Sequence, residues 1–198
     1  TSSVYGDNKT LPTNETIPTS NPLSPYAASK ISAELLSYNY HYHYGINTAI
    51  LRFFTVYGPF GRPDMVIFKF IKLILENKPI TIYGDGKSSR DYTYVTDVSD
   101  ALIASTKLNG YEIFNVGGGN GTTLDNLVKI IESLLGKKAI IQNIPRDPSD
   151  VEHSLADITK ISKILNWQPK YNIEEGVRET SKWFLNNLDF ISSINLKN

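Results

Sequence analysis

Apolar and polar positions follow two different periods along the chain, and together they predict an α/β protein. Apolar or alternating runs predict strands at residues 49–54, 80–83, 90–95, 112–116 and 139–143. Helical spacing predicts helices at residues 25–44, 65–75, 96–107, 122–135, 158–165 and 173–186. Thr96 and Asp97 are the expected cap of the third helix, and Thr122 or Thr123 that of the fourth. Residues 6–23 predict a polar loop, and residues 187–198 a frayed tail.

The helix at residues 25–44 carries the most informative pair of side chains. Ser24 and Pro25 predict its start, and Gly45 predicts its end. Tyr26 and Lys30 are four residues apart and therefore share one helical face. A free tyrosine has a pKa near ~10, and a lysine ammonium close to it lowers such a pKa. The spacing therefore predicts an oxygen base for hydroxyl groups.

The segments around this helix add a family resemblance. TSSVYG stands at residues 1–6, LRFFTVYGP at residues 51–59 and GRPDM at residues 61–65. With these motifs the chain resembles the extended short-chain dehydrogenase/reductase superfamily, in its nucleotide-sugar epimerase branch. The segment from Arg52 to Met65 is most similar to the UDP-glucuronate 4-epimerases. The resemblance covers nearly everything from Thr1 to about Leu185.

This resemblance implies a Rossmann-type fold, of which we expect only a part. Members of the superfamily open with a glycine-rich dinucleotide motif, and these 198 residues contain none. We therefore expect the C-terminal portion of a longer enzyme, inactive by itself. Residues 1–60 would be the end of a doubly wound, parallel NAD-binding sheet. Residues 61–187 would be mainly a smaller, mixed α/β lobe for the substrate, with segments returning to the sheet, and residues 188–198 a tail.

The resemblance also implies an NAD-dependent 4-epimerisation of a UDP-sugar. Tyr26 would take the proton of the sugar C4 hydroxyl while hydride passes to NAD, giving a transient 4-keto sugar. Thr1 would hydrogen-bond the reacting oxygen. Lys30 would bind the nicotinamide ribose, and Phe53 would pack near the nicotinamide or serve as a plain core aromatic.

Arg62 is the residue that we expect to set the choice of sugar. A planar guanidinium binds a carboxylate through two parallel hydrogen bonds, which suits a uronic acid. In the resembling enzymes, small hydroxyl residues at the positions of Ser2, Ser3 and Thr55 lie near the same carboxylate. The other residues expected to bind the nucleotide are Tyr83 at the uracil, Arg90 at the diphosphate, and Arg146 and Asp150 at a phosphate and the uridine ribose.

Other readings stay open at this point. A nucleotide-sugar 4,6-dehydratase would carry Asp and Glu after the threonine, where this chain has Ser2 and Ser3. A UDP-glucuronate decarboxylase uses the same ketone and normally carries a glutamate near this position. A non-catalytic fragment of such an enzyme is the third possibility. The identity of the sugar product distinguishes the dehydratase and the decarboxylase from the epimerase.

Composition narrows the partners. Lys and Arg together number 20, as do Asp and Glu, so nucleic acid is not an expected partner. No apolar run reaches the ~18 residues of a membrane span, and the absence of cysteine fits a cytoplasmic protein. No metal site is expected, because His41 and His43 point to different helical faces. The glycine-rich segment 117–121 lacks phosphate-loop spacing and predicts an ordinary turn. We expect a homodimer formed through the Tyr26–Lys30 helix.

Overall fold

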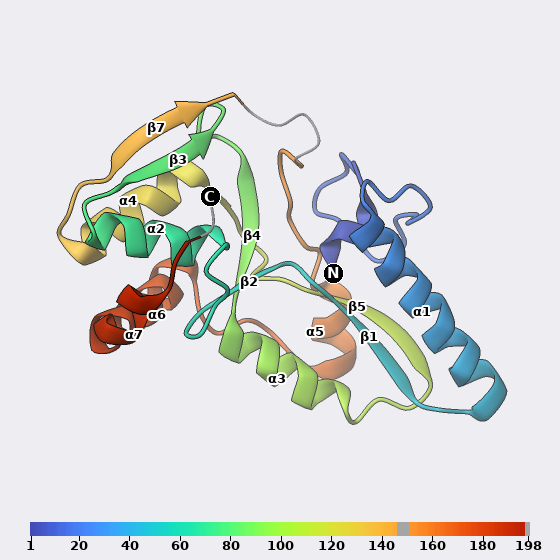
Figure 1. The fold of residues 1–198 in the computed structure, drawn as a ribbon. Coiled ribbons are helices and arrows are strands. Elements are labelled where there is room, and N and C mark those ends of the chain that lie inside the picture. Colours follow the sequence, from blue (N-terminus) through green and yellow to red (C-terminus); the bar gives the residue numbers. More distant parts are fainter. Residues whose placement is uncertain (146–150, 197–198) are drawn as a thin grey trace.

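The computed structural model describes residues 1–145 and 151–196 and has the predicted α/β architecture (Figure 1). Its helices are η1 (Ser2–Tyr5, a 3-10 helix), α1 (Pro25–Tyr44), α2 (Val66–Leu75), α3 (Val95–Ser105), α4 (Leu124–Leu135), α5 (Thr159–Leu165), α6 (Ile173–Asn186) and α7 (Leu188–Ser193). Its strands are β1 (Thr48–Phe53), β2 (Thr55–Tyr57), β3 (Pro79–Tyr83), β4 (Ser89–Tyr94), β5 (Tyr111–Val116), β6 (Gly121–Thr123) and β7 (Ile140–Ile144).

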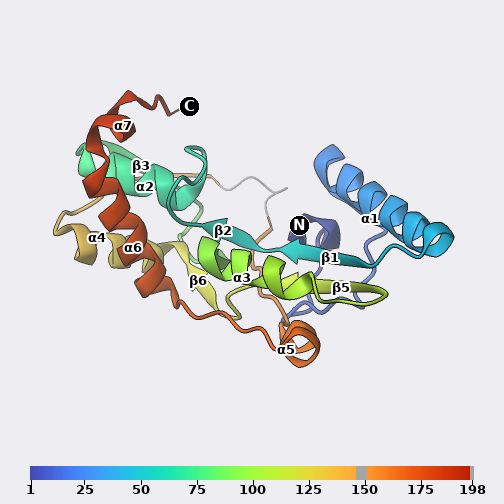
Figure 2. The same ribbon diagram turned by 90° about the horizontal axis from the view of Figure 1, so that it is seen from below.

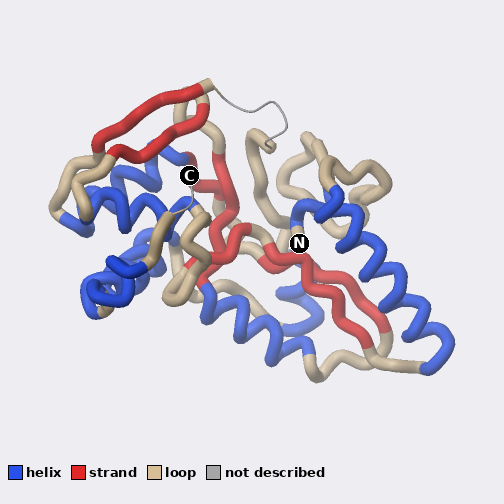
Figure 3. The backbone as a smooth tube through the Cα atoms, in the orientation of Figure 1, coloured by secondary structure: helices blue, strands red, loops and turns tan. Residues whose placement is uncertain are grey.

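The described strands form three small groups that are mostly parallel (Figure 3). β1 pairs with β5, β2 with β4, and β3 with β7, each in parallel, whereas β6 pairs with β4 in the antiparallel sense. Parallel pairs require crossover connections, and the helices between these strands supply them. The expectation of a parallel sheet with flanking helices is confirmed. The proposed division at residues 60 and 187 stays a prediction.

The β1–β5 pair is covered on both faces. α1 lies on one side, and α3 and α5 lie on the other (Figures 1 and 2). Side chains alternate along a strand, so Leu51 and Phe53 pack toward the buried cluster that α3 and α5 form with β5. Arg52 points the opposite way and hydrogen-bonds to α1. β1 therefore places one apolar wall and one charged contact on opposite faces.

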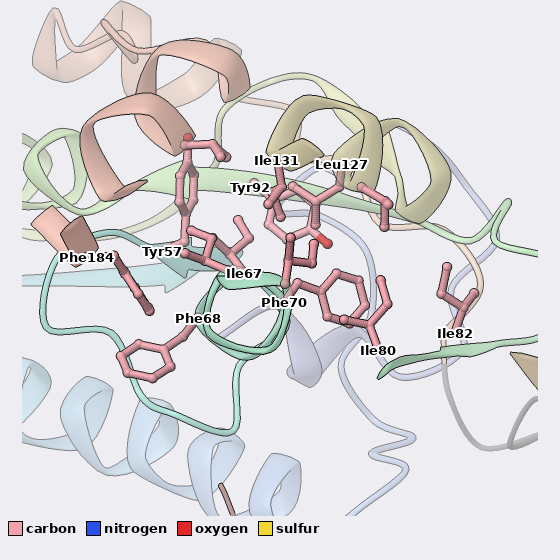
Figure 4. Close-up of a cluster of buried hydrophobic side chains, with 14 of the residues drawn as sticks. Tyr57, Ile67, Phe68, Phe70, Ile80, Ile82, Tyr92, Leu127, Ile131 and Phe184 are labelled. Atoms are coloured by element: carbon pink, nitrogen blue, oxygen red, sulfur yellow. The ribbon is translucent and has the colours of Figure 1, made fainter. Parts of the chain in front are cut away.

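A larger hydrophobic core fills the other half of the molecule (Figure 4). The rings of Phe68 on α2 and Phe184 on α6 meet edge to face, with centroids 4.7 Å apart. Tyr57 on β2 lies edge-on to both Tyr92 and Tyr94 of β4, at 6.1 and 5.7 Å. Tyr57 thereby connects this core to the strand that continues from β1.

A buried carboxylate organises the glycine-rich turn after β5. Asp91 on β4 is fully buried and accepts hydrogen bonds from the backbone N–H groups of Gly118, Gly119 and Ala156, at 2.6, 3.2 and 2.9 Å. Burial raises the pKa of Asp91 to about 6, against the opposing effect of these three donors. The N–H groups of the glycine-rich turn thus bind a carboxylate of the protein itself.

The predicted cap of α3 at Thr96 and Asp97 is wrong. This helix begins after Tyr94, which makes no capping side-chain bond. Asp97 is buried instead and accepts the backbone N–H groups of Lys170 and Tyr171, both at 3.1 Å. The Asp97 carboxylate therefore fixes the segment before α6, about 70 residues further along the chain. The other capping prediction is confirmed, since Thr123 caps α4 by accepting the N–H of Asn126.

The chain also contains short elements that its pattern did not predict. β2, β6 and η1 are each too short for a periodic signal. Residues 188–193 were expected to fray but form α7. Ile191 is buried in the large core, and its carbonyl accepts the Lys72 ammonium at 2.7 Å. These contacts hold α7 against the large core.

Candidate active site

α1 places Tyr26 and Lys30 side by side. The Ser24 hydroxyl accepts the N–H of Ala27 at 3.1 Å, with Pro25 in the first turn, as predicted. Gly45 ends the helix in the left-handed conformation, with φ 65°. The Lys30 ammonium lies 5.6 Å from the centroid of the Tyr26 ring, and the tyrosine is half exposed. The expected pair is present, and its catalytic role stays a prediction.

One cleft brings most of the predicted residues together. Its volume is about 990 Å³, and it lies where η1, α1, β1, β2 and the loop before α2 meet. The predicted residues that line it are Thr1, Ser2, Ser3, Tyr26, Lys30, Phe53, Thr55 and Arg62. These residues come from three separate stretches of sequence. Their convergence is therefore a property of the fold.

Thr1 reaches the cleft from the start of η1. Its hydroxyl accepts the N–H of Ser3 at 3.3 Å and donates to the Ser3 hydroxyl at 3.2 Å. Val4 and Tyr5, which end η1, are buried and anchor it. The 3-10 helix that follows Thr1 runs from residue 2 to residue 5.

Phe53 lies between the hydrophobic cluster and the cleft, and its packing near a nicotinamide stays a prediction. The ring is partly buried against the cluster beneath α3 and α5, and it also lines the cleft. It therefore gives the cleft an apolar wall that is fixed from behind.

Arg62 lies at the rim of the cleft and already has an anionic partner. Its guanidinium donates two hydrogen bonds to the carboxylate of Asp64, one of them at 3.1 Å from Nε. Both side chains are well exposed, at 76% and 57%. The hydrogen bond from Arg62 holds the pKa of Asp64 below its ordinary value. Sequence reasoning missed this pairing, although the two residues are only two positions apart.

A second, smaller pocket of about 210 Å³ shares Ser2, Ser3 and Thr55 with the cleft. Arg90 lines this pocket and donates to the carbonyls of Ser89 and Glu152, at 3.0 and 3.2 Å. Tyr83 ends β3, is half exposed, and lines neither space in the described part of the chain. Arg146 and Asp150 lie outside the described residues, and their predicted contacts stay predictions.

A buried charged network beside the cleft was not predicted. Arg52 on β1 binds the Glu34 carboxylate of α1 through Nε and Nη2, at 3.0 and 2.7 Å. Its Nη1 donates to the Tyr5 hydroxyl at 3.0 Å, and that hydroxyl donates to Asn115 at 2.6 Å. Burial works against the charge of Arg52, but the bonds to Glu34 and Tyr5 outweigh it and raise its pKa. An arginine inside an apolar strand was the available signal.

None of the helices at 1–145 and 151–196 is long and apolar enough to cross a membrane. The same residues hold no group of three His, Cys, Asp or Glu side chains arranged around a metal position.

Comparison with known proteins gives a consistent family relationship. Residues 1–180 match the family described as GDP-mannose 4,6 dehydratase. The chain is 49% identical over 195 residues to a UDP-glucuronate 4-epimerase of Thermodesulfobacterium geofontis, covering 98% of this chain and 60% of that protein. It is 38% identical to UDP-glucuronate 4-epimerase 5 of Arabidopsis thaliana, covering 93% and 46%. The chain thus spans about 60% or less of the length of these relatives.

Solved structures share the fold over the same span. The UDP-glucose 4-epimerase of Thermotoga maritima with UDP-glucose superposes with a TM-score of 0.87 at 36% identity, covering 93% of this chain and 60% of that one. The UDP-glucuronic acid 4-epimerase of Bacillus cereus with UDP-glucuronic acid and NAD gives a TM-score of 0.86 at 35% identity, covering 94% and 60%.

Proposed function

The chain belongs to the GDP-mannose 4,6 dehydratase family, and from that premise we propose that the full-length protein is an NAD-dependent UDP-sugar 4-epimerase. Its substrates are UDP-glucuronate and UDP-galacturonate, or UDP-glucose and UDP-galactose. The observation that carries the proposal is the single cleft that unites Thr1, Tyr26, Lys30 and Arg62. The epimerase names of the relatives support it.

The residues at the cleft suit the nicotinamide end of NAD. Lys30 and Tyr26 offer an ammonium and a hydroxyl, which match the hydroxyls of a ribose. Phe53 offers the fixed apolar wall that a flat ring requires. These 198 residues contain no glycine-rich fingerprint for the pyrophosphate, so the groups described here would hold the nicotinamide riboside. When bound, NAD would accept a hydride from C4 of the sugar and return the hydride to C4 later.

The protein side chains divide the proton chemistry among them. A nearby ammonium favours a phenolate, and Lys30 stands beside the Tyr26 ring. Tyr26 takes the proton from the C4 hydroxyl and gives it back after the 4-keto sugar has turned over. The Thr1 hydroxyl donates a hydrogen bond to the same sugar oxygen. Half exposure leaves the Tyr26 hydroxyl accessible from the cleft.

Binding of the substrate draws on both spaces. Ser2, Ser3 and Thr55 line the cleft and the smaller pocket, so they stand between the sugar and the region of Arg90. Arg90 would bind the diphosphate there, and Arg62 would receive the carboxylate of a uronic acid at the rim. Tyr83, Arg146 and Asp150 stay predictions for the uridine.

The composition of the cleft supports epimerisation over the alternatives. Water loss or decarboxylation of the 4-keto sugar, as the resemblance implies, uses carboxylates beside the threonine. Among the described residues that line the cleft, Glu34 is the only carboxylate, and Arg52 engages both of its oxygens. Ser2 and Ser3 occupy the positions that a dehydratase would fill with acids.

A homodimer through α1 is part of the same proposal. Leu35, Leu36 and Tyr40 on this helix are between 55% and 66% exposed, which is unusual for apolar side chains on one helix. Tyr42 and Tyr44 extend the same exposed surface. A cytoplasmic location rests only on the absence of cysteine.

The test is a product assay on the full-length protein. Incubation with UDP-glucuronate and NAD should yield UDP-galacturonate with no net change in NADH absorbance. Tyr26→Phe keeps the ring but removes the base, so kcat should fall by about 10²–10⁴-fold with little change in nucleotide binding. Release of carbon dioxide with a pentose product, or an unaffected Tyr26→Phe variant, would contradict the proposal.

A further inference from the structure

Arg52 joins every element that carries a predicted catalytic residue. Its guanidinium is only 3% exposed and uses three nitrogens, with Nε and Nη2 on Glu34 and Nη1 on Tyr5. The Tyr5 hydroxyl passes on to Asn115, whose amide donates to the carbonyl of Thr13 at 2.8 Å. This chain of bonds ties β1 to α1, η1, β5 and the polar loop.

The partners of Arg52 stand close in sequence to the candidate catalytic groups. Glu34 follows Lys30 by four residues and Tyr26 by eight, so all three share one face of α1 and line the cleft. Tyr5 ends the 3-10 helix that Thr1 caps. Arg52 therefore fixes the position of Thr1 relative to the Tyr26–Lys30 pair.

The same contact decides where the charge of Lys30 acts. An unpaired carboxylate one turn away would attract the Lys30 ammonium, as Glu and Lys do at this spacing. Glu34 instead gives both oxygens to Arg52 at bonding distance. The charged or titratable groups that face Glu34 are Arg52 from β1, Tyr111 from β5, Lys30 one turn earlier on α1 and, in this chain, the amino group of Thr1. Tyr5 from η1 contacts Arg52, and the carboxylate of Glu15 in the polar loop acts on Tyr5. The groups that face Tyr26 are Lys30 and Arg62.

We infer that Arg52 is a positioning residue for catalysis, which sets the spacing of Thr1 from Tyr26 and, by neutralising Glu34, leaves the Lys30 ammonium to Tyr26. The inference rests on the proposed function, since that function assigns the roles of these three residues. Arg52 touches neither sugar nor cofactor in this scheme.

Three variants of the full-length protein separate the roles. Arg52→Met keeps an unbranched apolar stem, removes the guanidinium and releases the Glu34 charge. We expect kcat to fall at least about tenfold with the KM for the UDP-sugar within about twofold, because binding groups are untouched. The base limb of the kcat–pH profile should move to higher pH, because a freed carboxylate draws the Lys30 ammonium away from Tyr26. The double variant Glu34→Gln/Arg52→Met has no freed charge and should return the limb to its wild-type position, while kcat stays low.

Arg52→Lys is the conservative control, and it should keep the wild-type base limb because the charge remains. A second readout does not depend on turnover. In protein labelled with ¹³Cζ-tyrosine, the Tyr26 signal, assigned through Tyr26→Phe, should titrate at higher pH in Arg52→Met than in wild type and the double variant. The same titration midpoint in all variants would overturn the inference, as would equal losses in kcat with no change in the pH profile. A shifted midpoint in a protein without epimerase activity would instead overturn the proposed function alone.

Discussion

Asp64 is expected to restrain the recognition of uronic acids, because it occupies the guanidinium that would bind them. Arg62 donates two hydrogen bonds to Asp64 across the exposed rim of the cleft. Exposed ion pairs are weak, and their measured strength corresponds to a factor of about two to five in an equilibrium constant. A sugar carboxylate must displace Asp64 first. Asp64→Asn should therefore raise kcat/KM for UDP-glucuronate by about two- to fivefold.

Arg62→Ala removes the cation itself, and a charged bidentate contact is worth far more than an exposed surface pair. We expect kcat/KM for UDP-glucuronate to fall by about 10–100-fold. Arg62→Lys should recover only part of this loss, since one ammonium lacks the planar fork. The double variant Arg62→Ala/Asp64→Asn should match Arg62→Ala, because without the arginine there is nothing for Asp64 to restrain.

Initial rates on UDP-glucuronate and UDP-glucose, measured side by side, provide the assay. UDP-glucose has no carboxylate and should be nearly indifferent to all four changes. The gain in Asp64→Asn should shrink at high salt, where exposed ion pairs are screened. Equal losses on both sugars in Arg62→Ala would refute the reasoning and assign Arg62 to structure or phosphate. A loss of glucuronate activity in Asp64→Asn would show that Asp64 orients Arg62 productively.

Three further predictions concern the chain itself. The 198-residue chain should bind NAD only weakly in calorimetry, because it has no glycine-rich turn for the pyrophosphate, and micromolar or tighter binding would contradict this. The pKa of Asp91 rises on folding from 3.8 to about 6. The stability that this shift contributes is complete below pH ~4 and decreases by roughly 3 kcal/mol as the pH rises to ~6 and above. A ¹³C titration of the Asp91 carboxyl that is complete below pH ~4 would disprove this prediction. Gly176→Ala should lower stability in urea by about 1–3 kcal/mol, since the added Cβ overlaps the buried Tyr57 hydroxyl, and an unchanged midpoint would show that the ring yields.

Long elements could be predicted from sequence because several independent signals agreed on each. α1 has its serine cap, its early proline and its terminal glycine at the expected positions. β1 stood out as an apolar run. Asp97 shows where such signals fail, since the same residue type serves as a helix cap or as a buried acceptor for a distant backbone. Only the tertiary structure decides between these uses.

The candidate site also contains one pair of residues that the sequence predicts and one that it does not. Tyr26 and Lys30 are neighbours on one helix, so their meeting was predictable from spacing alone. The pairing of Arg52 with Glu34 spans 18 positions and two elements, and no local pattern encodes it. A buried arginine indicates only that an anionic partner is present. Which carboxylate that is depends on how α1 lies against β1.

The passage from β1 to β2 limits how the length of this chain can vary. β1 pairs with β5 and β2 with β4, and only Phe54 separates them, with its N–H bonded to the carbonyl of Val116. Inserting or deleting one residue here would turn each side chain of β2 to the opposite face of the sheet. The Thr55 side chain would then turn away from the cleft, and the side chain next to it in sequence would point into the cleft. The two strand pairings therefore fix the number of residues between Arg52 and Tyr57.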